Sequence, residues 1–156
     1  NFIVDIQGDE PFLNPKHIDQ VVNFHKKNNS ADIILPSLKV RSKNNSNLVK
    51  IVKNSNGKVL YLSREDIPFS FKKKTKFFEK HLSIISFKPN ALLKFSRSKK
   101  TKLEKIENVE LLRALEIGLT IKSLDLKGGS FSVDVKQDYL KSLREFKKDK
   151  IYKKYI

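Results

Sequence analysis

The sequence predicts a single α/β domain built on a mixed sheet, and two patterns predict it. Short apolar runs of strand length alternate with segments whose apolar residues recur at helical spacing. Two of the apolar runs flank Asn54-Ser55-Asn56-Gly57, and Asn-Gly is a strong signal for a tight antiparallel turn. The chain has 156 residues, enough to bury one core. We therefore expect one domain over residues 1–156, with an antiparallel hairpin inserted among strands and helices.

The predicted strands follow the apolar runs. In chain order they cover residues 2–7, 31–40, 48–53, 58–63, 80–88 and 119–126. The run at 2–7 predicts a buried strand. The run at 31–40 contains Pro36, which has no backbone N–H and therefore predicts an edge or an interruption. A short extended segment at 131–134 then delivers Asp134.

The predicted helices lie between these strands and cover residues 15–27, 89–95, 103–115 and 137–148. The first begins at Asn14-Pro15, because Asn is a favoured N-cap and Pro fits the first helical position. The third ends at Gly118. Residues 69–78 are rich in Phe and Lys without a clear period, and we expect a loop that packs its aromatic side chains against another subunit.

Composition limits the classes of function. The chain has no cysteine, so it forms no disulfide. Its longest apolar stretches, such as 82–87, are strand-sized, and we expect a cytoplasmic protein without a membrane partner. The formal net charge of +16 fits nucleic acid or a polyanionic substrate. The lysines are spread along the chain, which favours compositional drift over a nucleic-acid surface.

The acidic turn after the first strand is a candidate metal site. Gln7-Gly8-Asp9-Glu10-Pro11 places two carboxylates at the carboxyl end of a strand, where open α/β sheets hold their ligands. Asp9 and Glu10 offer the oxygen ligands that Mg²⁺ prefers. The alternative is an ordinary turn with an exposed acid, and the pentapeptide alone leaves both open.

Other polar residues also have two explanations. Arg64 follows a strand and suits bidentate binding of a carboxylate, although such an Arg is usually solvated or ion-paired. His81 begins a strand and is a candidate donor to a hydroxyl or a structural residue. Asp134 is a candidate metal ligand or the N-cap of the last helix. Glu110 is a candidate acceptor or a solvated helix residue.

Five patterns occur together in chain order, and they carry a family resemblance. They are Gln7 to Pro11, Tyr61 to Pro68, Lys80-His81, Leu103 to Arg113, and Ser132-Val133-Asp134. With them the chain resembles the 3-deoxy-manno-octulosonate cytidylyltransferases, or CMP-Kdo synthetases, from Asn1 to about Leu143. The resemblance implies a Rossmann-like nucleotidyltransferase fold, with a mixed sheet flanked by helices and an inserted antiparallel hairpin. It also implies a C-terminal part that lacks the family's N-terminal loop for the CTP phosphates.

The resemblance implies an activity and a site. The family transfers CMP from CTP to a 2-keto-3-deoxy sugar acid such as 3-deoxy-manno-octulosonate and releases pyrophosphate, for lipopolysaccharide biosynthesis. It implies a homodimer and a Mg²⁺ ion held by two catalytic carboxylates, which match Asp9 and Asp134. The implied contacts to the sugar acid are Gln7, Arg64 for the carboxylate, His81 and Glu110.

The sequence departs from the family pattern at several positions. Leu111 stands where the family has Gln, so a hydrogen-bonding side chain is missing. Glu65-Asp66 places two negative charges beside Arg64, where we expect them to compete with a substrate carboxylate. Two alternatives follow. One is an inactive or substrate-diverged member or fragment of the same fold. The other is a basic nucleic-acid-binding domain, with 69–78 as its aromatic surface.

Overall fold

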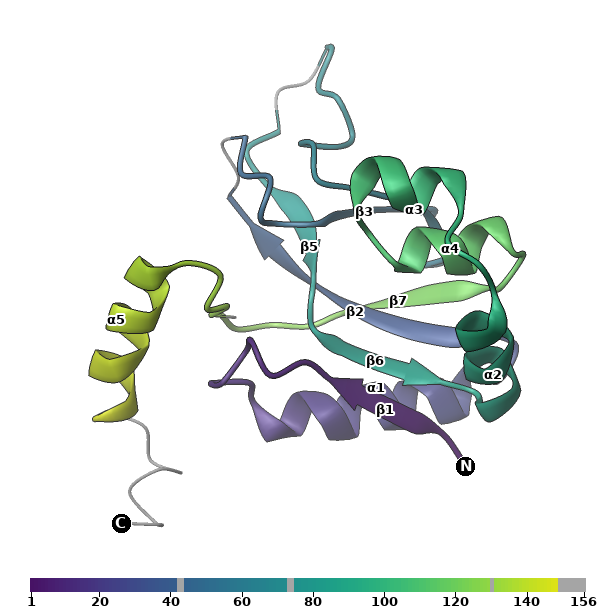
Figure 1. Ribbon diagram of the computed structural model, residues 1–156, viewed down its shortest axis with the longest axis horizontal. Coiled ribbons are helices and arrows are strands. Elements are labelled where there is room, and N and C mark those ends of the chain that lie inside the picture. The colour runs from purple at the N-terminus through teal and green to yellow at the C-terminus, as the bar shows by residue number, and fades with distance from the viewer. Residues whose placement is uncertain (42–43, 73–74, 130, 149–156) are drawn as a thin grey trace.

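The computed structural model describes residues 1–41, 44–72, 75–129 and 131–148. Within these ranges seven strands form one mixed sheet (Figure 1). The elements in chain order are β1 (Ile3–Ile6), α1 (Pro15–Lys27), β2 (Ile33–Val40), β3 (Lys50–Lys53), β4 (Val59–Ser63), β5 (Phe78–His81), β6 (Ile84–Phe87), α2 (Pro89–Arg97), α3 (Lys102–Glu107), α4 (Leu111–Glu116), β7 (Ile121–Asp125) and α5 (Lys136–Phe146). The predicted α/β class with a mixed sheet is confirmed.

Strand β2 lies at the centre of the sheet. It pairs in parallel with β7 on one side and antiparallel with β5 and β6 on the other. Of the two alternatives predicted from Pro36, the edge is therefore wrong and the interruption is confirmed. The carbonyl of Pro36 accepts the N–H of Leu82, in the gap between β5 and β6. Pairing is interrupted beside the residue that has no N–H, so the sheet tolerates a central proline.

Strand β1 was predicted to be buried, and that prediction is wrong. Among the described residues β1 pairs only with β6. Ile3 and Ile6 are 43% and 46% exposed. An edge strand of four residues has one free side, so its apolar side chains remain partly in solvent.

Two predicted elements are divided in the structure. The single helix predicted over 103–115 is α3 and α4, because Asn108 adopts the left-handed conformation, with φ 51° and ψ 47°. The strand predicted over 80–88 is β5 and β6. The hairpin is confirmed as β3 and β4, and Gly57 in its turn has φ +78°. Asn14 caps α1 as predicted, since its side chain accepts the N–H of Lys16 at 3.1 Å.

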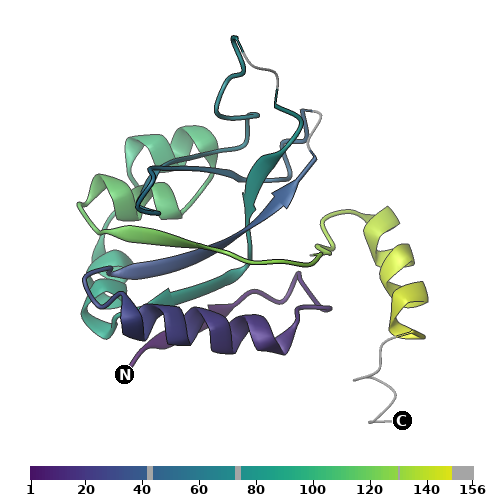
Figure 2. The ribbon, with the colours of Figure 1, turned by 180° about the vertical axis from the view of Figure 1, so that it is seen from behind.

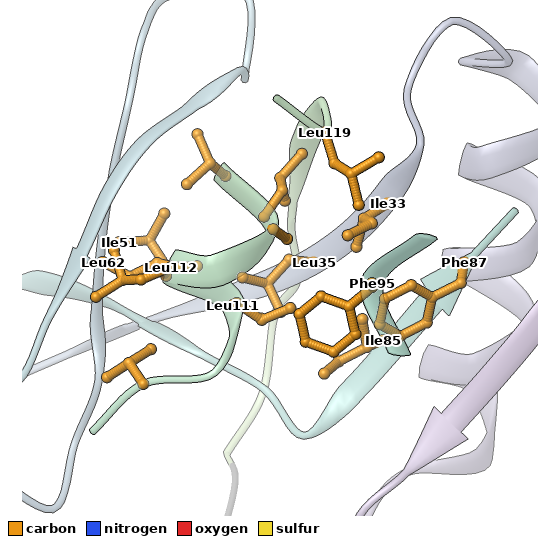
Figure 3. Packing of buried hydrophobic residues seen from close by; sticks show 14 of the residues in the cluster. Ile33, Leu35, Ile51, Leu62, Ile85, Phe87, Phe95, Leu111, Leu112 and Leu119 are labelled. Atoms are coloured by element: carbon orange, nitrogen blue, oxygen red, sulfur yellow. The ribbon is translucent and has the colours of Figure 1, made fainter. Parts of the chain in front are cut away.

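Helices cover both faces of the sheet (Figure 2). On one face α2 and α4 pack on the larger core cluster, where Phe87, Phe95, Leu111 and Leu112 meet the strand residue Leu35 (Figure 3). On the other face α1 packs through Val21 on Ile34 and Ile84. Helix α5 stands to one side of the sheet rather than on it (Figures 1 and 2). None of the described helices combines the length and apolarity needed to cross a bilayer.

Candidate active site

A backbone hydrogen bond brings the two predicted metal carboxylates together. The N–H of Val133 donates to the carbonyl oxygen of Asp9 at 2.8 Å. Asp134 follows Val133 directly, so its side chain lies beside the turn that carries Asp9. Partial burial and then the nearby Asp9 carboxylate raise the pKa of Asp134 above its usual value. This contact is consistent with the sequence prediction that Asp9 and Asp134 lie close together.

Asp134 does not cap the last helix. The N-cap of α5 is Val135, and the carboxylate of Asp138 accepts the N–H of Val135 at 3.3 Å. The same Asp138 oxygen accepts the N–H of Asp134 at 3.4 Å. The capping explanation for the Asp134 side chain is therefore wrong, and the helix leaves this carboxylate free to bind something else.

Glu10, the second acid of the opening turn, is used inside the protein. Lys80 and Glu10 are 7% and 4% exposed, and Lys80 Nζ lies 3.2 Å from Glu10 Oε1. Lys80 Nζ also donates to Ser132 Oγ at 2.9 Å, and Ser132 Oγ donates to Glu10 Oε1 at 3.3 Å. We call this the Lys80–Glu10–Ser132 network. It leaves Asp9 as the carboxylate that the turn presents to a ligand.

Two adjoining cavities collect the predicted site residues. The smaller, of about 180 Å³, is called the acidic cavity; the predicted residues that line it are Gln7, Asp9, Arg64, His81 and Asp134. The larger cavity, of about 490 Å³, is lined by Gln7, Arg64, His81 and Glu110 among others. Gln7, Val49, Arg64 and His81 line both cavities, so the two form one continuous site. The structure thus brings all six predicted residues to one place.

The Arg64 guanidinium is held by backbone carbonyls, and in the part of the chain that the structure describes it has no acidic partner. Its Nε donates to the carbonyl of Glu107 at 3.0 Å, and its two terminal nitrogens donate to those of Asn108 and Ser46 at 3.0 and 2.9 Å. Among the described residues no carboxylate forms an ion pair with it. Two of the five guanidinium N–H groups remain for a ligand. The charge is therefore fixed in place and uncompensated.

His81 is neutral and offers an acceptor. Its Nδ1 lies 3.2 Å from the carbonyl of Leu82, which only accepts, so Nδ1 carries the proton. Burial, followed by the neighbouring ammonium of Lys80, lowers the pKa of His81. The free Nε2 then accepts a hydrogen bond. This differs from the donor role expected from the sequence, because the only N–H of the neutral ring is already used.

Gln7 and Glu110 supply polar groups at the cavity walls. The backbone N–H of Gln7 donates to Ser83 at 3.1 Å, which fixes the end of β1 on the neighbouring segment. Glu110 immediately precedes α4. Both are exposed, and within the described chain neither side chain has a hydrogen bond or ion pair. They are available to a ligand.

The departures Glu65-Asp66 and Leu111 have structural explanations. Asp66 pairs with the buried Lys50 at 3.2 Å, and Glu65 is exposed. Among the ion pairs of the described residues, neither carboxylate is paired with Arg64, which does not support the competition expected from the sequence. Leu111 is buried in the larger core cluster beside Leu112, where an apolar side chain packs well.

Three residues of the site had no role assigned from the sequence. Lys80 and Ser132 lie within the motifs, and Glu107 accepts hydrogen bonds from Ser63 Oγ at 2.8 Å and from the Arg64 N–H at 3.1 Å. For Lys80 a signal existed. In a strand it shares a face with Phe78, so its ammonium points inward and needs a buried acid.

The carboxylate pair fits a magnesium ion. Across the described part of the chain, no group of three His, Asp or Glu side chains is arranged to hold a metal. Mg²⁺ does not need one, because it binds through one or two carboxylates and takes its other ligands from water and substrate phosphates. Asp9 and Asp134 provide that donor set. Neither carboxylate is occupied by a described side chain.

Comparisons with known proteins identify the family of the chain. A sequence model of the cytidylyltransferase family matches residues 1–122. The chain is 39% identical over 146 residues to the 3-deoxy-manno-octulosonate cytidylyltransferase of Rickettsia rickettsii (strain Sheila Smith), covering 92% of this chain and 58% of that protein. It is 37% identical over 150 residues to the same enzyme of Rickettsia prowazekii (strain Madrid E), covering 95% and 59%. The chain therefore spans a little over half the length of these relatives.

A solved structure shares the fold. It is CMP:2-keto-3-deoxy-manno-octonic acid synthetase complexed with CTP, with a TM-score of 0.82 and 21% identity. The match covers 94% of this chain and 61% of that one. The predicted nucleotidyltransferase fold is thereby confirmed. With a family match over most of its length, this chain belongs to the cytidylyltransferase family.

Proposed function

We propose that this chain forms the metal and sugar-acid part of a cytidylyltransferase that transfers CMP from CTP to a 2-keto-3-deoxy sugar acid such as 3-deoxy-manno-octulosonate. One observation carries the proposal. The carboxylates of Asp9 and Asp134 and the uncompensated guanidinium of Arg64 line the same cavity. A metal–phosphate complex and an acidic sugar need these two kinds of group side by side. The activity named for the Rickettsia relatives supports it.

Asp9 and Asp134 would hold Mg²⁺, which neutralises phosphate charge and polarises the attacking hydroxyl when bound. The two side chains come from segments far apart in the sequence and line the same cavity. Burial and then the Asp9 carboxylate raise the pKa of Asp134, and the Asp9 part of this effect supports the assignment, since a cation between two carboxylates relieves their repulsion.

Arg64 would bind the carboxylate of the sugar acid through its remaining N–H groups. Nε2 of His81 would accept a hydrogen bond from a sugar hydroxyl. Gln7 and Glu110 would bind other hydroxyls along the larger cavity. The anomeric oxygen forms a bond to the α-phosphorus. The bond from that phosphorus to the β-phosphate oxygen breaks, pyrophosphate leaves with the electron pair, and the hydroxyl proton passes to solvent.

The proposal extends to a cytoplasmic homodimer that serves lipopolysaccharide synthesis. The family resemblance implies both the homodimer and lipopolysaccharide biosynthesis. Phe69 and Phe71 are 83% and 85% exposed, and such large apolar side chains are typical of subunit contacts. We propose them as part of the dimer contact.

Pyrophosphate release tests the function. The full-length protein is incubated with CTP, Mg²⁺ and 3-deoxy-manno-octulosonate, and we expect Asp9→Ala and Asp134→Ala each to abolish release. Asp19→Ala, on the exposed surface of α1, is the matched control and keeps the wild-type rate. Near-normal release by either site variant contradicts the metal assignment. No release by the wild-type protein favours the inactive or substrate-diverged alternative.

A further inference from the structure

The Lys80–Glu10–Ser132 network joins three separate parts of the chain. Lys80 comes from β5, Glu10 from the turn after β1, and Ser132 from the extended segment before α5. Glu10 follows Asp9 in the sequence, and Ser132 precedes Val133. The N–H of Val133 and the carbonyl of Asp9 form the hydrogen bond described above. The network therefore lies directly against the contact that places Asp134 beside Asp9.

Few other described contacts hold this segment. It follows Gly128, which has φ +118°, and it leads to α5, which stands beside the sheet (Figure 1). Apart from the network and the Val133 hydrogen bond, the Phe12 ring contacts Phe131 at 5.8 Å and Phe146 of α5 at 4.7 Å between centroids. Lys80 supplies the charged, buried contact of the residues next to Asp134.

We propose that Lys80 is a positioning residue, which holds Asp134 beside Asp9 by binding Glu10 and Ser132 at once. The consequence for metal affinity rests on the proposed function. A buried ammonium bonded to two oxygens from different segments fixes their separation. In metal sites, groups that orient the ligands change affinity by about 10- to 100-fold when they are removed.

The sign of the effect separates positioning from simple electrostatics. A positive charge near a cation site repels the cation, so charge alone predicts that Lys80→Met tightens metal binding. Positioning predicts the opposite, because the variant releases Asp134 from Asp9. We expect the Kd for Mn²⁺, measured by electron paramagnetic resonance, to rise about 10-fold or more.

Ser132→Ala tests the same link without changing any charge. It removes the hydroxyl that joins the segment to Lys80 and Glu10. We expect the Mn²⁺ Kd to rise about fivefold, as for one net hydrogen bond. The amide of Val133 should also exchange with deuterium faster, while the amide of Leu126, bonded to Ser37 at 2.9 Å, keeps its rate.

Matched controls remove similar groups elsewhere. Lys53→Met deletes an ammonium that pairs with Glu79 at 2.6 Å, and Ser123→Ala deletes a buried hydroxyl bonded to Ser37 at 3.2 Å. Neither should change the Val133 exchange rate or weaken Mn²⁺ binding. Circular dichroism checks that each variant folds, and Ser132→Ala decides the question if Lys80→Met does not fold.

The outcomes distinguish this inference from the proposed function. Tighter or unchanged Mn²⁺ binding in folded Lys80→Met, or unchanged Val133 exchange in Ser132→Ala, overturns the positioning role. A wild-type protein that binds no Mn²⁺ overturns the metal assignment instead. In that case the Val133 exchange rate alone upholds or overturns the positioning role.

Discussion

Glu107 holds Arg64 at two points. One of its carboxylate oxygens accepts the backbone N–H of Arg64 at 3.1 Å, and its carbonyl accepts the side-chain Nε–H at 3.0 Å. Glu107 thus fixes the direction of the guanidinium through its backbone carbonyl. Its carboxylate binds the backbone N–H of Arg64 and does not pair with the guanidinium. A preorganised cation of this kind loses little conformational entropy when it binds an anion.

We expect Arg64→Lys to raise the KM for the sugar acid about 10-fold or more and to leave the KM for CTP unchanged. Lysine keeps the charge but cannot bond three carbonyls and a carboxylate in one plane. Steady-state kinetics with each substrate varied in turn measure the effect. Arg97→Lys, on the exposed side of α2, is the control, and an equal effect on both KM values contradicts the role of Arg64.

The stability of the fold should fall in mild acid because of His25. This ring is fully buried; its Nδ1 accepts from Ser86 Oγ at 2.8 Å and its Nε2 donates to Ala31 at 3.2 Å. Burial lowers its pKa below the usual value of 6.5. Below pH 6.5 the unfolded chain therefore binds a proton that the folded chain refuses, so stability is full above that pH and declines below it.

Urea unfolding at two pH values measures this loss. One histidine contributes at most about 1.4 kcal/mol per pH unit, and His81 contributes with the same sign. His25→Gln should therefore be less stable than wild type at pH 7.5 but should lose less on going to pH 5.5. Equal losses in the two proteins exclude His25 as a source of the acid sensitivity.

Gly57 in the β3–β4 turn should not tolerate a side chain. Its φ is +78°, and an added Cβ would lie 3.2 Å from the carbonyl oxygen of Ser123. We expect Gly57→Ala to lower the free energy of unfolding by about 1–2 kcal/mol, the strain of a left-handed residue. Gly129→Ala has open space around the new Cβ and is the control in the same denaturation experiment. Equal stability of the two variants contradicts this explanation.

Restoring the family's glutamine at position 111 should harm the protein rather than improve it. Leu111 is buried in the same core cluster as Leu112. Leu111→Gln buries an amide there, and we expect the free energy of unfolding to fall by about 1–3 kcal/mol. Thermal denaturation measures the loss, and Leu93→Gln, at a half-exposed leucine of α2, is the control. Leu111 also lines the larger cavity, so a lower KM for the sugar acid in Leu111→Gln would show that the new amide contacts the substrate.

The sequence predicted most elements because their signals are local. Asn14 and Pro15 fix the start of α1, and Asn56-Gly57 fixes the hairpin turn. The errors concern relations between distant segments. Pro36 has no backbone N–H and therefore indicates an edge or an interruption. The gap between β5 and β6 that accommodates it depends on how these two strands pair with β2, which the local sequence does not show.

The site follows the same division. Family motifs identified Asp9 and Asp134, and the contact through Val133 places them together. The proton on His81 could not be predicted, because it depends on the carbonyl of Leu82 in the folded chain. Neither could the partners of Asp66, since the sequence does not show that Lys50 lies buried beside it.

The Val133–Asp9 hydrogen bond also determines when the carboxylates of Asp9 and Asp134 lie side by side. Asp9 and Val133 lie near the two ends of the described chain, so their hydrogen bond closes a long loop. Closing a long loop costs more conformational entropy than closing a short one. A cation that needs both carboxylates binds only molecules in which the loop is closed. By mass action such a cation raises the melting temperature, and heating releases it as the two ends separate.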